Sequence, residues 1–115
     1  MEIEGKVNLP NGKIIEEVTS NYDDSNFTLK LNSEEVKLPL YVRNRKDGDR
    51  IHIKGMNGTK KVSDVFINEK IKTTDRDTWP VVLDAEDNIL WIPGLKKSKY
   101  DKKNDEKYDI ILRYY

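Results

Sequence analysis

The sequence contains no cysteine and a single histidine, His52, among its 115 residues. The absence of cysteine excludes disulfides, thiolate metal sites and thiol catalysis, and it fits the reducing cytoplasm. One histidine leaves little scope for nucleophilic triads built on that residue. Because His52 lies between Ile51 and Ile53, we interpret it first as a surface strand residue, second as a phosphate or base contact, and third as catalytic.

Long hydrophobic runs are also missing. No apolar run approaches the roughly 20 residues of a membrane-spanning helix, and no signal-peptide pattern follows Met1. The chain lacks a phosphate loop and a dinucleotide fingerprint. The acidic stretch 84–88 lacks the spacing of a calcium loop, so we interpret it as a turn. We therefore expect no catalytic residue, metal ligand or cofactor in this chain, no membrane partner, and a cytoplasmic location.

What is present is a highly charged, neutral composition. Charged residues make up 37% of the chain and hydrophobic ones 36%, and the formal net charge is zero. The length predicts a single domain over 1–115, in which 1–36 form either part of this domain or a segment of a preceding one. Acidic residues predominate in 1–36 and basic residues in 37–115. This asymmetry indicates either a basic face for an anionic partner or a chance distribution.

Strand-like alternation dominates the chain. Asn11-Gly12 predicts a hairpin between 6–9 and 13–18, and the turn at 84–88 predicts another between 81–83 and 89–92. Residues 27–31 alternate like a half-buried strand, and 108–115 resemble a closing strand. A short helix is expected after Lys61, and 96–106 are interpreted as a solvated, flexible loop. Trp79 and Trp91 adjoin apolar runs, which places them in the core.

The segment Val42–Lys61 concentrates charge of one sign, with seven Lys or Arg residues, two acids and three glycines. Alternation directs Arg43 and Arg45 outward from one predicted strand, and Arg50, His52 and Lys54 outward from the next. Joined by a turn at 46–49, these strands are expected to form a cationic ribbon. Like charges this close require compensation, and the candidate acids are Asp47, Asp49, Asp75 and Asp77.

A glycine loop follows the second predicted strand. Gly55-Met56-Asn57-Gly58 precedes Thr59, Lys60 and Lys61. Exposed amides of such a loop, beside a hydroxyl and two ammonium groups, are able to hold a phosphate. Amides at the start of a helix near Lys61 would add to this site. The alternative, a purely structural turn, is the more common role for each glycine.

An ordered set of short motifs resembles the C-terminal domain of bacterial tRNA(Ile)-lysidine synthetase. The resemblance spans 38–98. It rests on Pro39-Leu40-Tyr41-Val42-Arg43-Asn44-Arg45, Gly48-Asp49-Arg50-Ile51, Gly55-Met56-Asn57-Gly58-Thr59-Lys60-Lys61-Val62-Ser63-Asp64, Phe66-Ile67, Lys70-Ile71, Arg76-Asp77, Trp79-Pro80-Val81-Val82 and Ile89-Leu90-Trp91-Ile92-Pro93-Gly94. Residues 1–36 match less clearly, and the loop 99–107 looks particular to this sequence.

The resemblance implies an α/β, mainly β fold. It is a layered domain of the type shared with the phenylalanyl-tRNA synthetase β subunit, with an unusual β-sandwich and one or two short helices. Enzymes of this family use ATP and Mg²⁺ in a separate N-terminal catalytic domain to attach lysine to the wobble cytidine of tRNA(Ile). This chain is then a non-catalytic domain that holds the tRNA body, including its acceptor stem. The partners are tRNA(Ile) and the catalytic domain of the same protein.

Seven basic residues are the predicted phosphate and sugar contacts: Arg43, Arg45, Arg50, Lys54, Lys60, Lys61 and Arg76. Gly55, Gly58 and Thr59 form the possible phosphate loop. Two other classes of function stay open. One is an interdomain or protein–protein module without RNA contact, which would dock its basic face on an acidic surface. The other is a small hydrolase, which would require Asp75 and Asp77 to converge with Asp84 or Asp87 around a metal.

Overall fold

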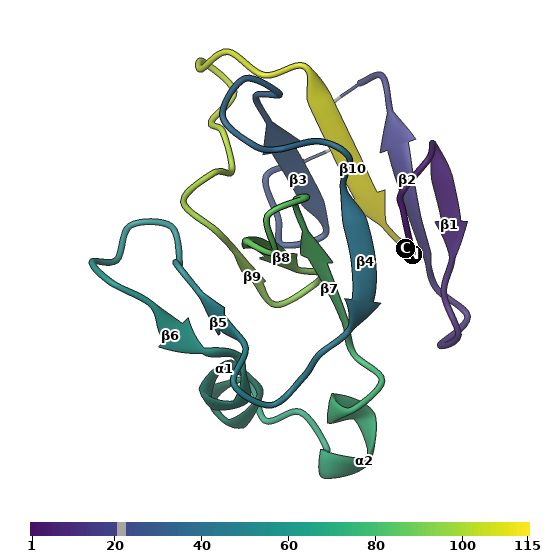
Figure 1. The fold of residues 1–115 in the computed structure, drawn as a ribbon, viewed down its shortest axis with the longest axis vertical. Helices are drawn as coiled ribbons and strands as arrows, with labels where there is room; N and C mark the ends of the chain where they lie inside the picture. The colour runs from purple at the N-terminus through teal and green to yellow at the C-terminus, as the bar shows by residue number, and fades with distance from the viewer. Residues whose placement is uncertain (21–22) are drawn as a thin grey trace.

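Two antiparallel four-stranded sheets make up most of the computed structural model, which describes residues 1–20 and 23–115 (Figure 1). The first sheet has the order β1-β2-β10-β3 and the second β4-β7-β8-β9, while β5 pairs with β6. The strands are β1 (Lys6–Asn8), β2 (Ile14–Val18), β3 (Thr28–Leu31), β4 (Tyr41–Asn44), β5 (Arg50–Ile51), β6 (Lys60–Lys61), β7 (Pro80–Leu83), β8 (Ile89–Ile92), β9 (Lys96–Lys97) and β10 (Ile110–Tyr114). The helices of the described residues are α1 (Val62–Asn68) and α2 (Thr73–Arg76). The predicted fold, mainly β with one or two short helices, is confirmed.

Both predicted hairpins are confirmed, and local turn chemistry explains them. Gly12 adopts a φ of 83° between β1 and β2, a conformation that glycine reaches without strain. In the β7–β8 turn, the Asp84 carboxylate accepts hydrogen bonds from the N–H groups of Glu86 and Asn88, both at 3.0 Å. This turn is the acidic stretch that superficially resembles a metal loop.

The main core lies between the two large sheets. Ile15 from β2 and Leu112 from β10 belong to the same buried cluster as Val42, Val82 and Trp91 of the second sheet. Trp91 is fully buried, as predicted. Its indole N–H donates to the Asn26 carbonyl at 2.9 Å, and its ring meets Tyr114 edge-on. Trp91 therefore bonds to the segment before β3 while packing against β10.

A second core covers the opposite face of the β4-β7-β8-β9 sheet. Val62, Val65 and Phe66 of α1 pack with Val81 and Ile92. Strands β7 and β8 are buried along their whole length, which explains why their sequences are continuous apolar runs instead of alternating ones. The predicted helix after Lys61 is confirmed. Neither helix of the described residues is long and apolar enough to cross a membrane.

Two local predictions were wrong. The strand expected over 27–31 is β3, but it is buried along its whole length, and Phe27 at its start is exposed. The stretch 96–106 is only in part the solvated loop expected: β9 pairs with β8, and Ser98 and Asp101 are buried, while 103–106 are exposed and lie outside any strand. The two errors have one cause: Lys30 N donates to the Asp101 carboxylate and Lys102 N to the Lys30 carbonyl, so this stretch covers the free edge of β3.

Candidate nucleic-acid interface

The predicted turn at 46–49 joins β4 to β5 and is built around the Asp49 carboxylate. Arg43 donates to both carboxylate oxygens, at 2.9 and 3.0 Å. The Lys46 N–H donates to the same carboxylate at 2.7 Å. The Asp49 carbonyl in turn accepts from the N–H of Val62, which ties the turn to the start of α1. Arg43 therefore holds the protein's own backbone in place.

Stability in acid is expected to depend on Asp49. Burial raises the pKa of its carboxyl, but hydrogen bonds from Arg43 and Lys46, with their charges, outweigh burial and hold the pKa below its usual value. Such a group stabilises the fold above its unfolded pKa of about 3.9, and the contribution is lost as pH falls through the folded pKa. We expect Asp49→Asn to be less stable than wild type at neutral pH. Below about pH 4 it should lose less further stability than wild type does.

Urea unfolding of both proteins at neutral pH and at several acidic pH values measures this difference. The same dependence of unfolding free energy on pH in the two proteins would contradict the role of Asp49.

Arg45 is also held by intramolecular partners. Its guanidinium donates to Asp47 at 3.1 Å and to Asp77 at 2.9 Å, and it lies 5.7 Å from the centre of the Phe66 ring. Only 15% of its side chain is exposed. The prediction that neighbouring acids compensate these arginines is confirmed for Asp47, Asp49 and Asp77. Within the described residues, Asp75 forms no ion pair with them.

A basic ribbon does exist, but not between the strands predicted. Strand β4 pairs with β7, and β5 pairs with β6. Beyond β5, Ile53 forms a bridge with Ser98, flanked by bonds from Lys54 N to the Lys97 carbonyl and from Lys99 N to the His52 carbonyl. Since Ile53 and Ser98 are buried, alternation sends their neighbours to the opposite face. We call the residues on that face the basic ribbon: Arg50, His52, Lys54, Lys97 and Lys99. The Lys97 side chain is only 10% exposed.

One end of the basic ribbon opens into a polar hollow of about 220 Å³. Three basic or imidazole side chains and one carboxylate line it together with polar, aliphatic and aromatic groups: Arg50, His52, Lys99, Asp87, Thr59, Asn88, Ile89 and Tyr100. The Arg50 guanidinium donates to the Thr59 hydroxyl at 2.7 Å and to its carbonyl at 3.3 Å. This hollow, which we call the polar hollow, combines cationic, hydroxyl and aromatic groups in the way that a phosphate and sugar site requires.

The predicted glycine loop lies beside the polar hollow. Gly55 and Gly58 have φ of 80° and 74°, and the loop joins β5 to β6. His52 Nε2 lies 3.1 Å from the Met56 carbonyl, which anchors the loop. Helix α1 begins at Val62 as expected, yet the Val62 N–H is already bonded to Asp49. The loop geometry is that of a turn, and phosphate binding by Gly55, Gly58 and Thr59 stays a prediction.

The remaining predicted contacts differ in their surroundings. Lys54 donates to the buried carboxylate of Asp101 at 2.8 Å, and Arg76 donates to the Ile71 carbonyl at 2.9 Å. Lys60 and Lys61 form β6 and, among the described residues, make no ion pair. The structure therefore brings Arg50 and Lys54 into the basic ribbon, while Arg43, Arg45 and Arg76 are held by partners within the protein.

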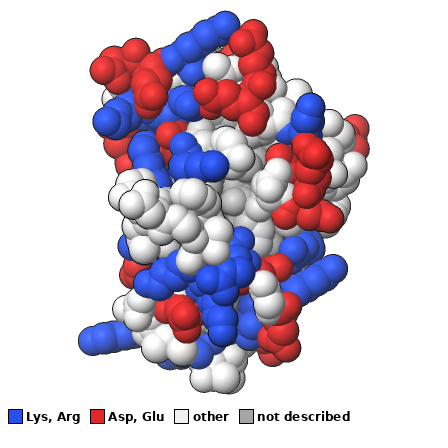
Figure 2. All heavy atoms as spheres, turned by 60° about the vertical axis from the view of Figure 1, so that its left-hand side comes forward, with Lys and Arg blue, Asp and Glu red and all other residues white. Residues whose placement is uncertain are grey.

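Figure 2 shows the face on which β5, β6 and β9 lie. Lys and Arg side chains form a broad band across its lower part, with few acidic groups among them. Acidic side chains are more numerous in the upper part, where they are intermixed with basic ones, and along one side of this view. The neutral total charge of the chain is thus unevenly distributed over its surface.

Sequence reasoning missed Lys97, Lys99 and Tyr100. The run of lysines between 96 and 103 indicated a basic segment. The segment around Ile53, with which this run pairs, lies more than 40 residues earlier in the chain. Without that partner, the run has the composition of a solvated loop.

The small-hydrolase hypothesis finds no support in this geometry. In the described parts of the chain, no three His, Cys, Asp or Glu side chains are grouped to hold a metal ion. Asp77 is bonded to Arg45, and Asp84 is bonded within its own turn. The convergence with Asp75 and Asp87 that a metal site requires is therefore absent among these residues.

The fold defines the class of protein. The chain superimposes with a TM-score of 0.60 on a crystal structure of an N-terminal fragment of the phenylalanyl-tRNA synthetase β subunit from Pyrococcus horikoshii, with 14% identity, covering 76% of this chain and 27% of that one. It also matches a crystal structure of the TilS C-terminal domain with a TM-score of 0.84 and 41% identity, covering 95% of this chain and 88% of that one. The expected layered domain of the lysidine synthetase and phenylalanyl-tRNA synthetase type is confirmed.

Sequence comparison then identifies the family. The model of the TilS substrate C-terminal domain matches residues 40–112, and the chain belongs to this family. It is 46% identical over 112 residues to the tRNA(Ile)-lysidine synthase of Bacillus subtilis strain 168, covering 92% of this chain and 23% of that protein. It is 52% identical over 82 residues to the same enzyme of Bacillus licheniformis, covering 70% of this chain and 17% of that protein. The chain thus spans about a quarter or less of these relatives.

Proposed function

We propose that this chain is the tRNA-binding C-terminal domain of a tRNA(Ile)-lysidine synthase and that the basic ribbon and polar hollow are its RNA contact surface. One observation carries the proposal: the bridge between Ile53 and Ser98 gathers basic side chains from two distant segments on one face. Contacts with phosphate and sugar position an RNA without reading its sequence. Recognition by shape and 2′-OH groups is typical of A-form RNA.

In this proposal, the domain does no chemistry. It positions tRNA(Ile) with anticodon CAU so that the catalytic domain, outside this chain, ligates lysine to the wobble cytidine. ATP and Mg²⁺ act in that domain, and the enzyme works in the cytoplasm with its tRNA. Because the isolated chain has no net charge, its own affinity for tRNA is low, and tethering to the catalytic domain raises the effective concentration of the bound RNA.

The proposal is tested by removing charge from the polar hollow. We expect Arg50→Gln with Lys99→Gln to weaken tRNA binding by about tenfold and to reduce the slope of log affinity against log salt by about one to two. The matched control, Lys6→Gln with Lys13→Gln, removes the same charge from exposed positions of the β1–β2 hairpin and should change both quantities less. Filter binding across a salt series measures them.

Two outcomes would contradict RNA binding by this surface. One is the absence of tRNA binding by the wild-type chain, and the other is an equal loss in the two double variants. Arg43 and Arg45 stay predicted contacts, but they are poor test positions. Their ion pairs with Asp49 and Asp77 tie strand and turn together, so their replacement changes the fold along with the charge.

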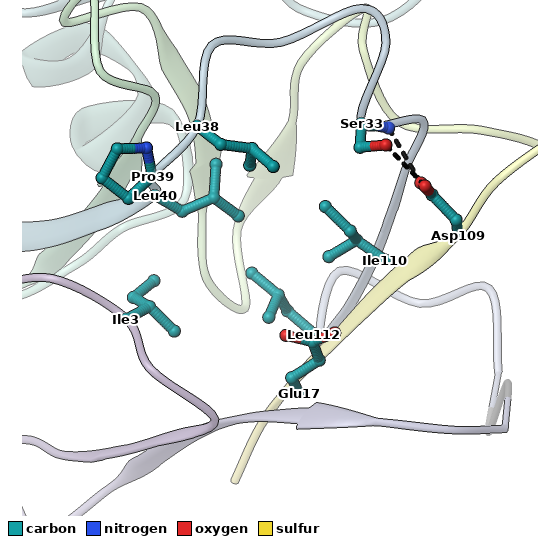
Figure 3. A pocket seen from close by; sticks show the side chains of 9 residues that line it. All are labelled: Ile3, Glu17, Ser33, Leu38, Pro39, Leu40, Asp109, Ile110 and Leu112. Carbon is teal, nitrogen blue, oxygen red and sulfur yellow. Dashed lines mark hydrogen bonds between the residues drawn. The ribbon is translucent and has the colours of Figure 1, made fainter.

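A second candidate function, docking onto the rest of the enzyme, is favoured by an apolar groove of about 390 Å³ (Figure 3). Ile3, Leu38, Leu40, Ile110 and Leu112 line the groove, and 53% of Leu38 is exposed. Glu17 and Asp109 lie at the same groove, and Asp109 is held by Ser33. The occupant that this chemistry fits is an apolar segment with a basic residue from the remaining three quarters of the enzyme.

Amide NMR spectra distinguish the two functions. Docking predicts that the remainder of the enzyme shifts the amide signals of Leu38, Leu40 and 110–112 while tRNA leaves the basic ribbon unshifted. RNA binding predicts shifts at 50–54 and 97–100 when tRNA is added.

A further inference from the structure

A second hollow, of about 330 Å³, lies at the other end of the basic ribbon. We call it the lysine hollow because five lysines line it: Lys30, Lys54, Lys97, Lys102 and Lys103. We propose that the lysine hollow binds a phosphate oxyanion. This inference rests on the proposed function in one respect, namely that the oxyanion belongs to a backbone phosphodiester of the bound tRNA.

The hollow is organised by one buried carboxylate. Asp101 has a side chain that is 1% exposed. It accepts hydrogen bonds from Lys54 at 2.8 Å and from the N–H of Lys30 at 3.0 Å, and it forms an ion pair with Lys97 at 3.2 Å. The Lys30 ammonium is buried as well and donates to Asp24 and Asn104. Asp101 therefore holds two ammonium groups close together at the wall of the hollow.

These ammonium groups retain unused donors. Each has three N–H groups. Among the described residues, Lys54 donates one of them to Asp101, Lys97 donates one to the Asp24 carbonyl and is ion-paired with Asp101, and the Lys103 ammonium donates none. Seven N–H groups around one hollow thus lack a hydrogen-bond acceptor in the part of the chain that the structure describes. Phosphate oxygens are strong acceptors for such charge-assisted hydrogen bonds.

The charge of the hollow also favours a single anion. Asp24 and Asp101 line it, Lys102 is paired with Glu35 at 2.6 Å, and Glu106 accepts from the N–H of Lys103. That N–H, with smaller contributions from the charges of neighbouring lysines, holds the pKa of Glu106 below its usual value against a small opposing effect of desolvation. Five lysines against four carboxylates leave one net positive charge, which one phosphodiester group neutralises. The space exceeds that of several waters at about 30 Å³ each.

The alternative is that the lysines serve only to fasten 96–107 to β3. Fastening explains Asp101 and Lys30, whose contacts are complete. It does not explain the side chain of Lys103, which is exposed and whose residue joins the fold only through its backbone, with the N–H donating to the Glu106 carboxylate and the carbonyl accepting from the Glu106 N–H. Phosphate binding explains why Lys103 is among the residues that line the hollow. Lys103 is therefore the position at which phosphate binding and fastening lead to different expectations.

The test combines two titrations of the whole 115-residue chain. Inorganic phosphate is expected to shift the amide signals of 54, 97 and 103 together. For tRNA, we expect Lys54→Gln with Lys103→Gln to weaken binding about three- to tenfold and to lower the salt slope by about one. The control, Lys13→Gln with Lys107→Gln, changes two exposed lysines outside the hollow and should have a smaller effect. If Lys54→Gln unfolds the chain, Lys103→Gln alone is expected to lower the salt slope.

The outcomes separate this inference from the proposed function. If wild type binds tRNA, the hollow variant binds as tightly as the control, and phosphate shifts no signal, then the lysine hollow is overturned while RNA binding by the domain stands. If tRNA fails to bind but phosphate shifts the three amides, then the proposed function fails and the oxyanion of the hollow is free phosphate.

Discussion

Replacing Trp91 with alanine is expected to lower the free energy of unfolding by about 3–5 kcal/mol. The side chain is fully buried on β8 and lies in the core between the two sheets. Its loss leaves a cavity that Tyr114 and the neighbouring strands cannot fill without moving. It also leaves the Asn26 carbonyl without its indole donor. Urea-induced unfolding, followed by circular dichroism, measures the change.

Trp91→Phe is the matched control, because it keeps an aromatic ring at this position and removes the indole N–H. We expect it to cost about 1–3 kcal/mol, from the lost hydrogen bond and a smaller cavity. A loss below about 1 kcal/mol for Trp91→Ala would contradict the role of Trp91 in joining the sheets. The core would then depend mainly on the aliphatic residues of β2 and β10.

Local elements of this fold were predictable because local chemistry determines them. Asn11-Gly12 specifies a tight turn whatever surrounds it, and the Asp84 carboxylate closes its hairpin within four residues. The apolar residues of α1 recur at helical spacing and face one core. Each of these signals lies within a short window of sequence, so the hairpins and the helix followed from the chain alone.

Strand pairing was not predictable, because alternation shows which way a side chain points and not which strand lies beside it. Arg43 and Arg50 both alternate with apolar residues, so the sequence favoured a ribbon between their strands. In the structure, Asp49 forms an ion pair with Arg43 of β4, and Asp77 forms one with Arg45, which follows β4. Lys97 of β9 and Lys99, which follows β9, then lie beside Lys54 and His52.

The burial of Lys30 was likewise not predictable from alternation. A lysine in an alternating strand is normally a solvated residue, yet this one is 1% exposed. Its partner Asn104 lies 74 residues away, and the covering carboxylate of Asp101 lies 71 residues away. The alternation of residues within 27–31 cannot predict contacts with groups so distant in sequence. Motif resemblance predicted the family where periodicity failed, because an ordered series of short motifs carries long-range information that no single strand contains.

Replacing Asp101 with alanine is expected to destabilise the chain by about 3–5 kcal/mol, as for other buried charges that lose their partner. The change leaves Lys54 and Lys97 facing each other without a carboxylate, and it leaves the N–H of Lys30 without an acceptor. Asp101→Asn keeps an acceptor oxygen but not the charge, so we expect an intermediate loss in urea unfolding.

Phosphate makes this prediction specific to the lysine hollow. In Asp101→Asn, the two ammonium groups of Lys54 and Lys97 lose their fixed counterion. A bound oxyanion then stabilises the folded state more than it does in wild type. We expect inorganic phosphate to raise the unfolding midpoint of Asp101→Asn more than that of wild type, by the mass-action stabilisation of a ligand that binds only folded protein. Chloride at equal ionic strength is the control for screening. Equal effects of phosphate on both proteins would mean that Asp101 only fastens the covering segment to β3 and that its lysines meet no anion.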